Sequence, residues 1–319
     1  MSMQKIYIYF FLYSKISCSC IRRHEAHLLC QGCGNIIQRN NIMSDEKDKQ
    51  ITNESAPVPF ESSVYIWNSR MLFLRKSIAS TEHRHHAVQI CIGLEGPVGV
   101  RDDNKIYREH RAVLIDTECP HTIEAADARH AFLFIEPELS VVQKIRERHL
   151  AGEKIRELDF TPLRPFAERL LNCYDRQHSC AEIGGLMDDI LFAVAGTGKT
   201  IQTLDYRIRK ALSLIAEADE KISPRDIALS VELSEGRLQH LFKEQVGVPI
   251  RQYRLWRKLI LAIRHISQFD IITHAAYEAG FADSAHMSRT FKRMFGISIT
   301  EILKTSRAGA RLALHICGE

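Results

Sequence analysis

The sequence predicts two folded domains, an N-terminal all-β barrel and a C-terminal all-α domain with two helix-turn-helix units. Three observations support this fold class. The chain has 319 residues, a length that favours two domains of ordinary size. Short apolar runs rich in β-branched and aromatic residues dominate residues 60–137. A stretch of sequence with helical spacing recurs within the last hundred residues.

The composition is typical of a globular protein. Hydrophobic residues make up 45% and charged residues 26% of the chain, which excludes disordered and collagen-like classes. The longest apolar run, residues 6–13, has eight residues, whereas a membrane-spanning helix needs about twenty. The net charge is +4, and residues 205–304 hold 16 Lys and Arg against 12 Asp and Glu. Such a local excess fits a phosphate-facing surface or a solvated mixed-charge face.

Residues 1–59 are expected to be a disordered or mis-assigned N-terminal extension. Met43 opens a polar stretch that resembles an ordinary protein start, so residues 1–42 need not belong to the natural protein. A signal peptide after Lys5 is disfavoured because no small-residue cleavage site follows. The nine cysteines are unevenly spaced and do not resemble a secreted disulfide framework. A zinc site remains an alternative in this extension, with these ligands: Cys18, Cys20, His24, His27, Cys30 and Cys33.

Residues 60–137 are expected to form the barrel, because apolar runs alternate with turn signals such as Gly96-Pro97 and Asp102-Asp103-Asn104. The expected strands are VQICIGL, VGVRDD, KIYREH, AVLIDT and HAFLFIE. Residues 138–204 change to a helical period, which predicts a linker, a dimerisation surface or both. Within that segment, GTGKT at 196–200 lacks the Gly and the preceding strand of a phosphate-binding loop. We interpret it as a linker after a helix that ends at Gly196.

The last hundred residues contain an internal repeat. LFKEQVGVPI at 241–250 matches TFKRMFGISI at 290–299 with an offset of 49 residues. A short amphipathic helix precedes each copy, at 224–231 with Ser223 as N-cap and at 271–279 with Asp270 as N-cap. Each pair of helices predicts one helix-turn-helix unit. Residues 250–266 are expected to form a connecting helix of roughly 26 Å, close to the 34 Å repeat of B-DNA.

The second helix of each unit has an apolar stripe, which leaves polar residues on the outward side. Arg can bind guanine and Gln can bind adenine through two hydrogen bonds, whereas Lys and Ser tend to hold phosphates. The candidate DNA-binding residues are Gly236, Arg237, Gln239, His240 and Lys243 in the first unit, and Ser284, Ala285, Ser288, Arg289, Lys292 and Arg293 in the second.

Residues 206–304 resemble the AraC/XylS family of bacterial transcription regulators, through the strings SEGRLQHLFKEQVGVPIRQYRLWRKL and AYEAGFADSAHMSRTFKRMFGIS. The resemblance implies base contacts at Gly236, Gln239 and His240, and at Ala285, Ser288 and Arg289. Gly236 and Ala285 are small, which weakens the contacts expected there. Ile299 stands where many members of the family have Pro.

HRHHAVQICIGLEG resembles the first motif of cupin barrels, which places His83 and His85 at two ligand positions and Gln89 where a Glu is usual. His121 falls where a later cupin histidine is expected. These four residues are candidates for an effector or a metal site. We expect an effector pocket without a divalent metal, because Gln removes the negative charge of the usual carboxylate. A metal site, or histidines held in strands by hydrogen bonds, are the alternatives.

The resulting prediction is a cytoplasmic regulator of transcription, without a cofactor and without enzymatic activity. Its partners would be double-stranded promoter DNA, a small-molecule effector, RNA polymerase and a second copy in a homodimer, with no membrane. The sensor would occupy residues 60–137, the DNA-binding domain residues 205–305, and a tail residues 306–319. The alternatives are a metal-dependent cupin enzyme whose helices serve assembly, and a scaffold whose helices bind protein.

Overall fold

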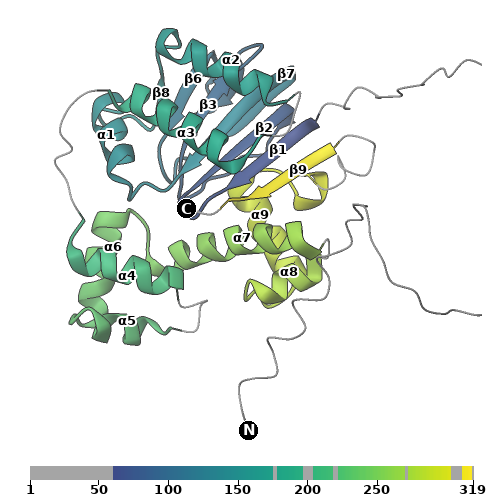
Figure 1. Ribbon diagram of the computed structural model, residues 1–319. Helices are drawn as coiled ribbons and strands as arrows, with labels where there is room; N and C mark the ends of the chain where they lie inside the picture. The colour runs from purple at the N-terminus through teal and green to yellow at the C-terminus, as the bar shows by residue number, and fades with distance from the viewer. Residues whose placement is uncertain are drawn as a thin grey trace, which may run out of the picture. The chain divides into compact units, whose positions relative to one another are not determined.

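The fold is taken from a computed structural model that describes residues 60–174, 178–196, 204–217, 222–269, 272–302 and 311–317 (Figure 1). The strands are β1 (Phe60–Ile66), β2 (Arg70–Ala79), β3 (Val88–Gly93), β4 (Val98–Arg101), β5 (Tyr107–His110), β6 (Ala112–Ile115), β7 (Thr122–Ile135), β8 (Ile155–Glu157) and β9 (Arg311–Ile316). The helices are α1 (Ser140–His149), the 3-10 helix η1 (Thr161–Leu163), α2 (Arg164–Asn172), α3 (Cys180–Ala195), α4 (Tyr206–Glu217), α5 (Pro224–Ser230), α6 (Glu235–Val246), α7 (Ile250–Phe269), α8 (Ile272–Glu278) and α9 (Ser284–Phe295). A β-rich N-terminal region and a helical C-terminal region with two helix-turn-helix units are thus confirmed.

The strands form one sheet, in which the pairings run in the order β8-β6-β3-β7-β2-β1-β9. The β4–β5 hairpin joins this sheet through β7. Among the described residues, β8 and β9 are the two ends of the path, so the strands pair as an open sheet. The 14-residue β7 is long enough to pair with β2, β3 and β4, and it therefore organises the sheet.

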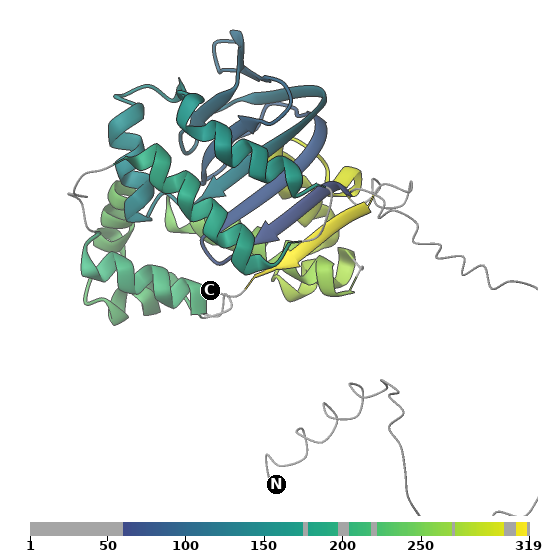
Figure 2. The ribbon, with the colours of Figure 1, turned by 45° about the horizontal axis from the view of Figure 1, so that its top comes forward.

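Both faces of the sheet are covered, and all six residues of β3 (VQICIG) are therefore buried. Alternate residues of β7 point to opposite faces, Phe132 and Phe134 to one and Leu133 and Ile135 to the other. Helices α1, α2 and α3 cover the second face, and α7 and α9 lie on the first (Figures 1 and 2). The sheet is therefore the middle layer between two sets of helices.

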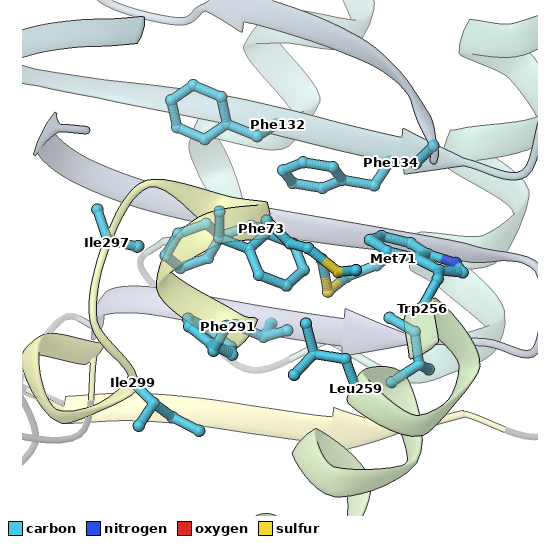
Figure 3. Packing of buried hydrophobic residues seen from close by; sticks show 14 of the residues in the cluster. Met71, Phe73, Phe132, Phe134, Trp256, Leu259, Phe291, Ile297 and Ile299 are labelled. Atoms are coloured by element: carbon cyan, nitrogen blue, oxygen red, sulfur yellow. The ribbon is translucent and has the colours of Figure 1, made fainter. Parts of the chain in front are cut away.

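Helices α7 and α9 share one hydrophobic core with the first face of the sheet (Figure 3). Phe295 of α9 packs its ring against Phe134 of β7, with ring centroids 5.5 Å apart. Trp256 of α7 lies 5.8 Å from the same ring of Phe295. The first helix-turn-helix unit has a separate core around Phe242 and Ile227. The two units thus differ in what supports them.

Residues 138–196 are more than a connection between domains. Their helices α1 and α3 bury Val142, Ile145 and Ile190 against the sheet, and β8 pairs with β6. The apolar faces that predicted a linker or a dimerisation surface are therefore occupied by the sheet. Gly196 ends α3 as predicted, with a φ of 66°, whereas residues 197–200 of GTGKT lie outside the described residues.

The residues set apart as a C-terminal tail contain β9, which pairs in parallel with β1. A disulfide between Cys180 of α3 and Cys317 holds the end of this strand. The spacing of the cysteines did not predict this bond. The proposed zinc ligands at residues 18–33, and the expected N-cap Asp270, lie outside the described residues.

Candidate nucleic-acid interface and histidine cluster

Helix α6 presents its polar side to solvent. Its N-cap Ser234 accepts a hydrogen bond from the backbone N–H of Arg237, and Gly247 ends the helix in the left-handed conformation with a φ of 87°. Leu238 and Phe242 are buried in the core of the first unit. All five candidates of this unit are exposed: Gly236, Arg237, Gln239, His240 and Lys243.

Helix α9 has the same construction, with Asp283 as the N-cap and Gly296 at its C-terminal end. Met287 and Phe291 are buried against the sheet side of the molecule. The six candidates of this unit divide into exposed Ala285, Arg289, Lys292 and Arg293 and half-buried Ser284 and Ser288. The sequence of α9 contains no acidic residue, whereas α6 contains Glu235 and Glu244. The positive potential is therefore stronger at the second unit.

A groove of about 680 Å³ runs between the two units, beside α7. Its cations include Lys243 of α6 and Arg251 and Arg254 of α7. Sequence reasoning missed the two α7 arginines because it treated this helix only as a connection. Their three-residue spacing puts both on one side of the helix, and that spacing is the signal that could have found them. The groove extends the basic surface between α6 and α9.

The second candidate site is a cluster of three buried histidines. His83 and His85 precede β3, and His121 precedes β7. His83 and His121 pair as an isolated antiparallel bridge, which holds the two segments together. One potential ligand atom from each of the three residues lies within 4.8 Å of the others. The structure thus brings together the residues that the cupin resemblance selected.

Each of these imidazoles faces a backbone carbonyl with Nδ1. The Nδ1 atoms of His83, His85 and His121 lie 2.9, 2.9 and 2.8 Å from the carbonyl oxygens of Thr81, Ala87 and Cys119. Because a carbonyl oxygen only accepts, each Nδ1 carries the proton. Burial lowers the pKa of His83 to about 3 and that of His85 to about 4, and lowers the pKa of His121 well below its usual value. The imidazoles are therefore neutral, with a lone pair on Nε2.

Gln89 of β3 completes the cluster. Its Oε1 lies 2.9 Å from Nε2 of His85 and 3.2 Å from Nε2 of His121. His83 and Gln89 line a cavity of about 60 Å³, whose other lining side chains are almost all apolar and come mainly from the sheet, α7 and α9. Sites for organic ligands usually measure roughly 300–1,000 Å³. The cavity is much smaller than such sites, so an organic effector would require it to expand.

Comparisons with known proteins agree with the repeat. A helix-turn-helix domain family matches residues 227–305. The arabinose operon regulatory protein of Escherichia coli K12 is 32% identical over 101 residues, 31% of this chain and 35% of that protein. The transcriptional activator RhaS of Escherichia fergusonii is 38% identical over 85 residues, 26% of this chain and 30% of that protein. These matches span about a third of each relative's length.

A solved structure, ToxT from Vibrio cholerae O395, covers 74% of this chain and 97% of its own, with 14% identity and a TM-score of 0.49. The family match falls on the helices described above, from within α5 to beyond α9. Within the described part of the chain, none of the helices combines the length and apolarity needed to cross a membrane.

Proposed function

We propose that this chain is a sequence-specific DNA-binding regulator of transcription of the AraC/XylS family, with a helix-turn-helix domain at residues 227–305. The observation that carries the proposal is that α6 and α9 are built in the same way. Both helices have a capped N-terminus, a buried apolar side and an exposed polar side. Each is the second helix of its helix-turn-helix unit, and in such units the second helix binds in the major groove of DNA.

Helix α7 supplies the separation that two adjacent groove segments need. It has 20 residues, which at about 1.5 Å each give about 30 Å. The helical repeat of B-DNA is about 34 Å. One chain can therefore place α6 and α9 in successive turns of the major groove on one side of the duplex.

The exposed residues divide by chemistry into two roles. In this proposal Gln239 and Arg289 read base edges, because their side chains form paired hydrogen bonds with adenine and guanine. Lys243, Lys292 and Arg251 contact phosphates and fix the register. The remaining candidates, His240, Ser284, Ser288 and Arg293, add polar contacts beside them. Gly236 and Ala285 allow close approach of the backbone.

The β-sheet domain is proposed to sense a small ligand beside His83, His85, Gln89 and His121. The cavity there is lined by residues of both the sheet and α9, so occupation by a ligand can change how the second unit packs. The proposal includes action in the cytoplasm, as a homodimer that contacts RNA polymerase, with no catalysed reaction. Two relatives that match about a third or less of this chain are named as an operon regulator and a transcriptional activator, which supports regulation over catalysis.

Fluorescence anisotropy of the full chain tests this function. The full chain is needed because α7 and α9 share their core with the sheet. DNA from upstream of the chain's own gene is compared with a scrambled duplex at two salt concentrations. We expect at least 10³-fold tighter binding to the upstream DNA, weakening steeply with salt. Equal affinity for both duplexes, or no binding, would overturn the proposal.

A further inference from the structure

Three arginines from separate parts of the chain line one pocket of about 400 Å³. Arg84 lies in the segment before β3, Arg251 in the first turn of α7, and Arg293 in the last turn of α9. The other residues that line this pocket are neutral. Like charges gathered at one site repel one another unless an anion neutralises them. The pocket therefore favours an anion.

The chain itself supplies no anion to these three guanidinium groups. Among the residues that the structure describes, none forms a hydrogen bond or an ion pair with the side chain of Arg84, Arg251 or Arg293. All three residues are exposed. By contrast, Arg257 of the same helix α7 pairs with Glu136 at 3.1 Å. The three arginines are therefore available to a partner from outside the chain.

The carboxylates near Arg84 already have partners of their own. Glu82, two residues before Arg84, forms an ion pair with Lys105. Glu118 accepts a hydrogen bond at its Oε2 from the side-chain amide of Gln252, at 2.5 Å. Neither carboxylate lines the pocket. A small movement of Arg84 would therefore not place it in an internal ion pair without breaking another contact.

The backbone on both sides of Arg84 is anchored. His83 and His85 are buried, which leaves the side chain of Arg84 outward. His83 and His121 exchange two backbone hydrogen bonds of 3.0 Å, and the carbonyl of His85 accepts from the backbone N–H of Glu118 at 2.9 Å. A side chain on an anchored backbone has less freedom to lose on binding. Arg84 is therefore presented as part of a preformed site.

The location of the pocket identifies the anion. Arg251 also lines the groove between the two units, together with Gln239 of α6 and His286 of α9. Arg293 lies four residues after Arg289 on the exposed side of α9. The pocket is thus continuous with the surface that is proposed to contact DNA. Guanidinium groups bind phosphate through paired hydrogen bonds, and the DNA backbone supplies phosphates along this whole surface.

We propose that Arg84, Arg251 and Arg293 bind a phosphate of the DNA backbone, so that the β-sheet domain itself contacts the duplex. This inference rests on the proposed function and extends the DNA interface beyond the two helix-turn-helix units. Because Arg251 borders the groove between α6 and α9, the phosphate lies between the two segments of the major groove. Such a contact adds affinity and fixes the register without reading sequence.

DNA titrations of the full chain test the contact, with upstream and scrambled duplexes at several salt concentrations. Arg84→Ala should weaken binding to both duplexes alike, by about fivefold, and reduce the salt slope by about one, because one phosphate contact is lost. Arg84→Lys should lose part of the affinity but keep the salt slope, since the charge remains while the paired hydrogen bond is lost. Arg84→Glu should weaken both duplexes more than Arg84→Ala does.

Arg164→Ala is the matched control. Arg164 is exposed at the start of α2, and α2 covers the face of the sheet opposite to α7 and α9. The variant removes one positive charge far from the pocket, and charges more than roughly 10 Å apart are largely screened at about 0.1 M salt. We therefore expect its affinity and salt slope to match those of the wild type. Equal losses in Arg84→Ala and Arg164→Ala would show an effect of net charge and overturn the contact.

A neutral methylphosphonate in place of single phosphates of the upstream duplex locates the contact. At the phosphate that Arg84 binds, this replacement should weaken binding of the wild type about fivefold but change binding of Arg84→Ala little, because both changes remove the same interaction. Additive losses at every phosphate would overturn the contact. So would an Arg84→Ala variant with wild-type DNA affinity, the result expected if the pocket held the phosphate of a small molecule.

The proposed function and this inference fail in different ways. A wild type that binds upstream and scrambled DNA equally would overturn sequence-specific regulation, while a loss on both duplexes in Arg84→Ala would still support the phosphate contact. A wild type that prefers upstream DNA, with Arg84→Ala identical to it in affinity and salt slope, would overturn the phosphate contact alone. A wild type that binds neither duplex would overturn both.

Discussion

Arg289 and Lys292 lie one turn apart on the exposed side of α9, but their side chains contribute differently to DNA binding. Arg289→Ala should cost about 1–3 kcal/mol on the cognate duplex and relax its sequence preference, because a paired hydrogen bond to a base is lost. Lys292→Ala should weaken cognate and scrambled DNA alike and reduce the salt slope by about one. Anisotropy titrations at several salt concentrations measure both. Equal losses on the two duplexes for Arg289→Ala would contradict its base-reading role.

The exposed residues of α6 and α9 could be predicted because helical periodicity alone decides which side is apolar. Leu238 and Phe242 are four residues apart and therefore lie on the same, buried side of α6. Gln239 and Lys243 then face outward. The histidine cluster was predictable only as a set of residue types. Which ring nitrogen carries the proton depends on the carbonyls of Thr81, Ala87 and Cys119, and backbone positions in loops do not follow from the sequence.

Asp116 connects three parts of the chain around the end of β6. Arg146 of α1 donates to its Oδ1 at 2.7 Å, and Lys154 donates to its Oδ2 at 2.7 Å. Burial by itself raises the pKa of Asp116, but the hydrogen bonds from Arg146 and Lys154 outweigh it, so the pKa lies below the ordinary value of 3.8. The ionised form is therefore preferred in the folded protein.

A carboxyl group whose pKa is lower in the folded than in the unfolded chain stabilises the fold at pH values above its unfolded pKa. This contribution is lost as the pH falls through its folded pKa. Asp116→Asn should therefore lower the free energy of unfolding near neutral pH. The difference from the wild type should shrink as the pH falls below 3.8. Urea unfolding at a series of pH values measures this. Asp189→Asn is a control, since its pair with Arg169 is 55% exposed on both sides and contributes little. A pH-independent difference for Asp116→Asn would contradict the prediction.

At the scale of elements, β8 and β9 are the strands that lie outside the region predicted to form strands, and β9 is the harder of the two to predict. RLALHI alternates as a strand should, but its partner β1 lies about 250 residues earlier in the chain, and local patterns carry no information on such a pairing. The strands of residues 60–137 were easier to predict from the sequence, because turn signals separate them and most of their partner strands are close in sequence. The helices of residues 138–196 were predicted as helices, but not as a cover for the sheet.

The Cys180–Cys317 disulfide holds β9 and α3 together across a separation of 137 residues. Closing so long a loop restricts the unfolded chain, and its loss should cost about 2–5 kcal/mol. We expect dithiothreitol to lower the urea midpoint of the wild type, and to leave the Cys180→Ser, Cys317→Ser double variant unchanged. A wild-type midpoint that does not respond to dithiothreitol would contradict this. The cytoplasm proposed for this chain is reducing, so the redox state of this pair decides whether β9 is covalently held there.

At the scale of the whole molecule, the two helix-turn-helix units are supported unequally. The second unit and one face of the sheet share a core that includes Phe134, Trp256 and Phe295, whereas the first unit has its own core around Phe242. A repeat in sequence suggests two equivalent units. The inequality comes from packing between segments far apart in the chain, and the similarity of the repeat cannot reveal it.

This difference predicts how loss of stability spreads. Phe134→Ala removes a ring from the shared core and should cost about 3–5 kcal/mol, and amide hydrogen exchange should then accelerate in α9 as well as in β7. Phe242→Ala should accelerate exchange in α5 and α6 while the sheet and α9 keep their protection. Mass spectrometry of peptides from exchanged protein measures each segment separately.

If Phe134→Ala left α9 protected, the second unit would be stable without the sheet. A ligand in the sheet domain could then not act on it through packing. Faster amide hydrogen exchange in both β7 and α9 would instead mean that any ligand altering this face of the sheet also alters α9. The DNA contacts of α6 would then stay unchanged. Regulation in this molecule would then act on one half of the DNA-binding domain, and operator contacts at the α9 half-site should respond to the ligand more than those at the α6 half-site.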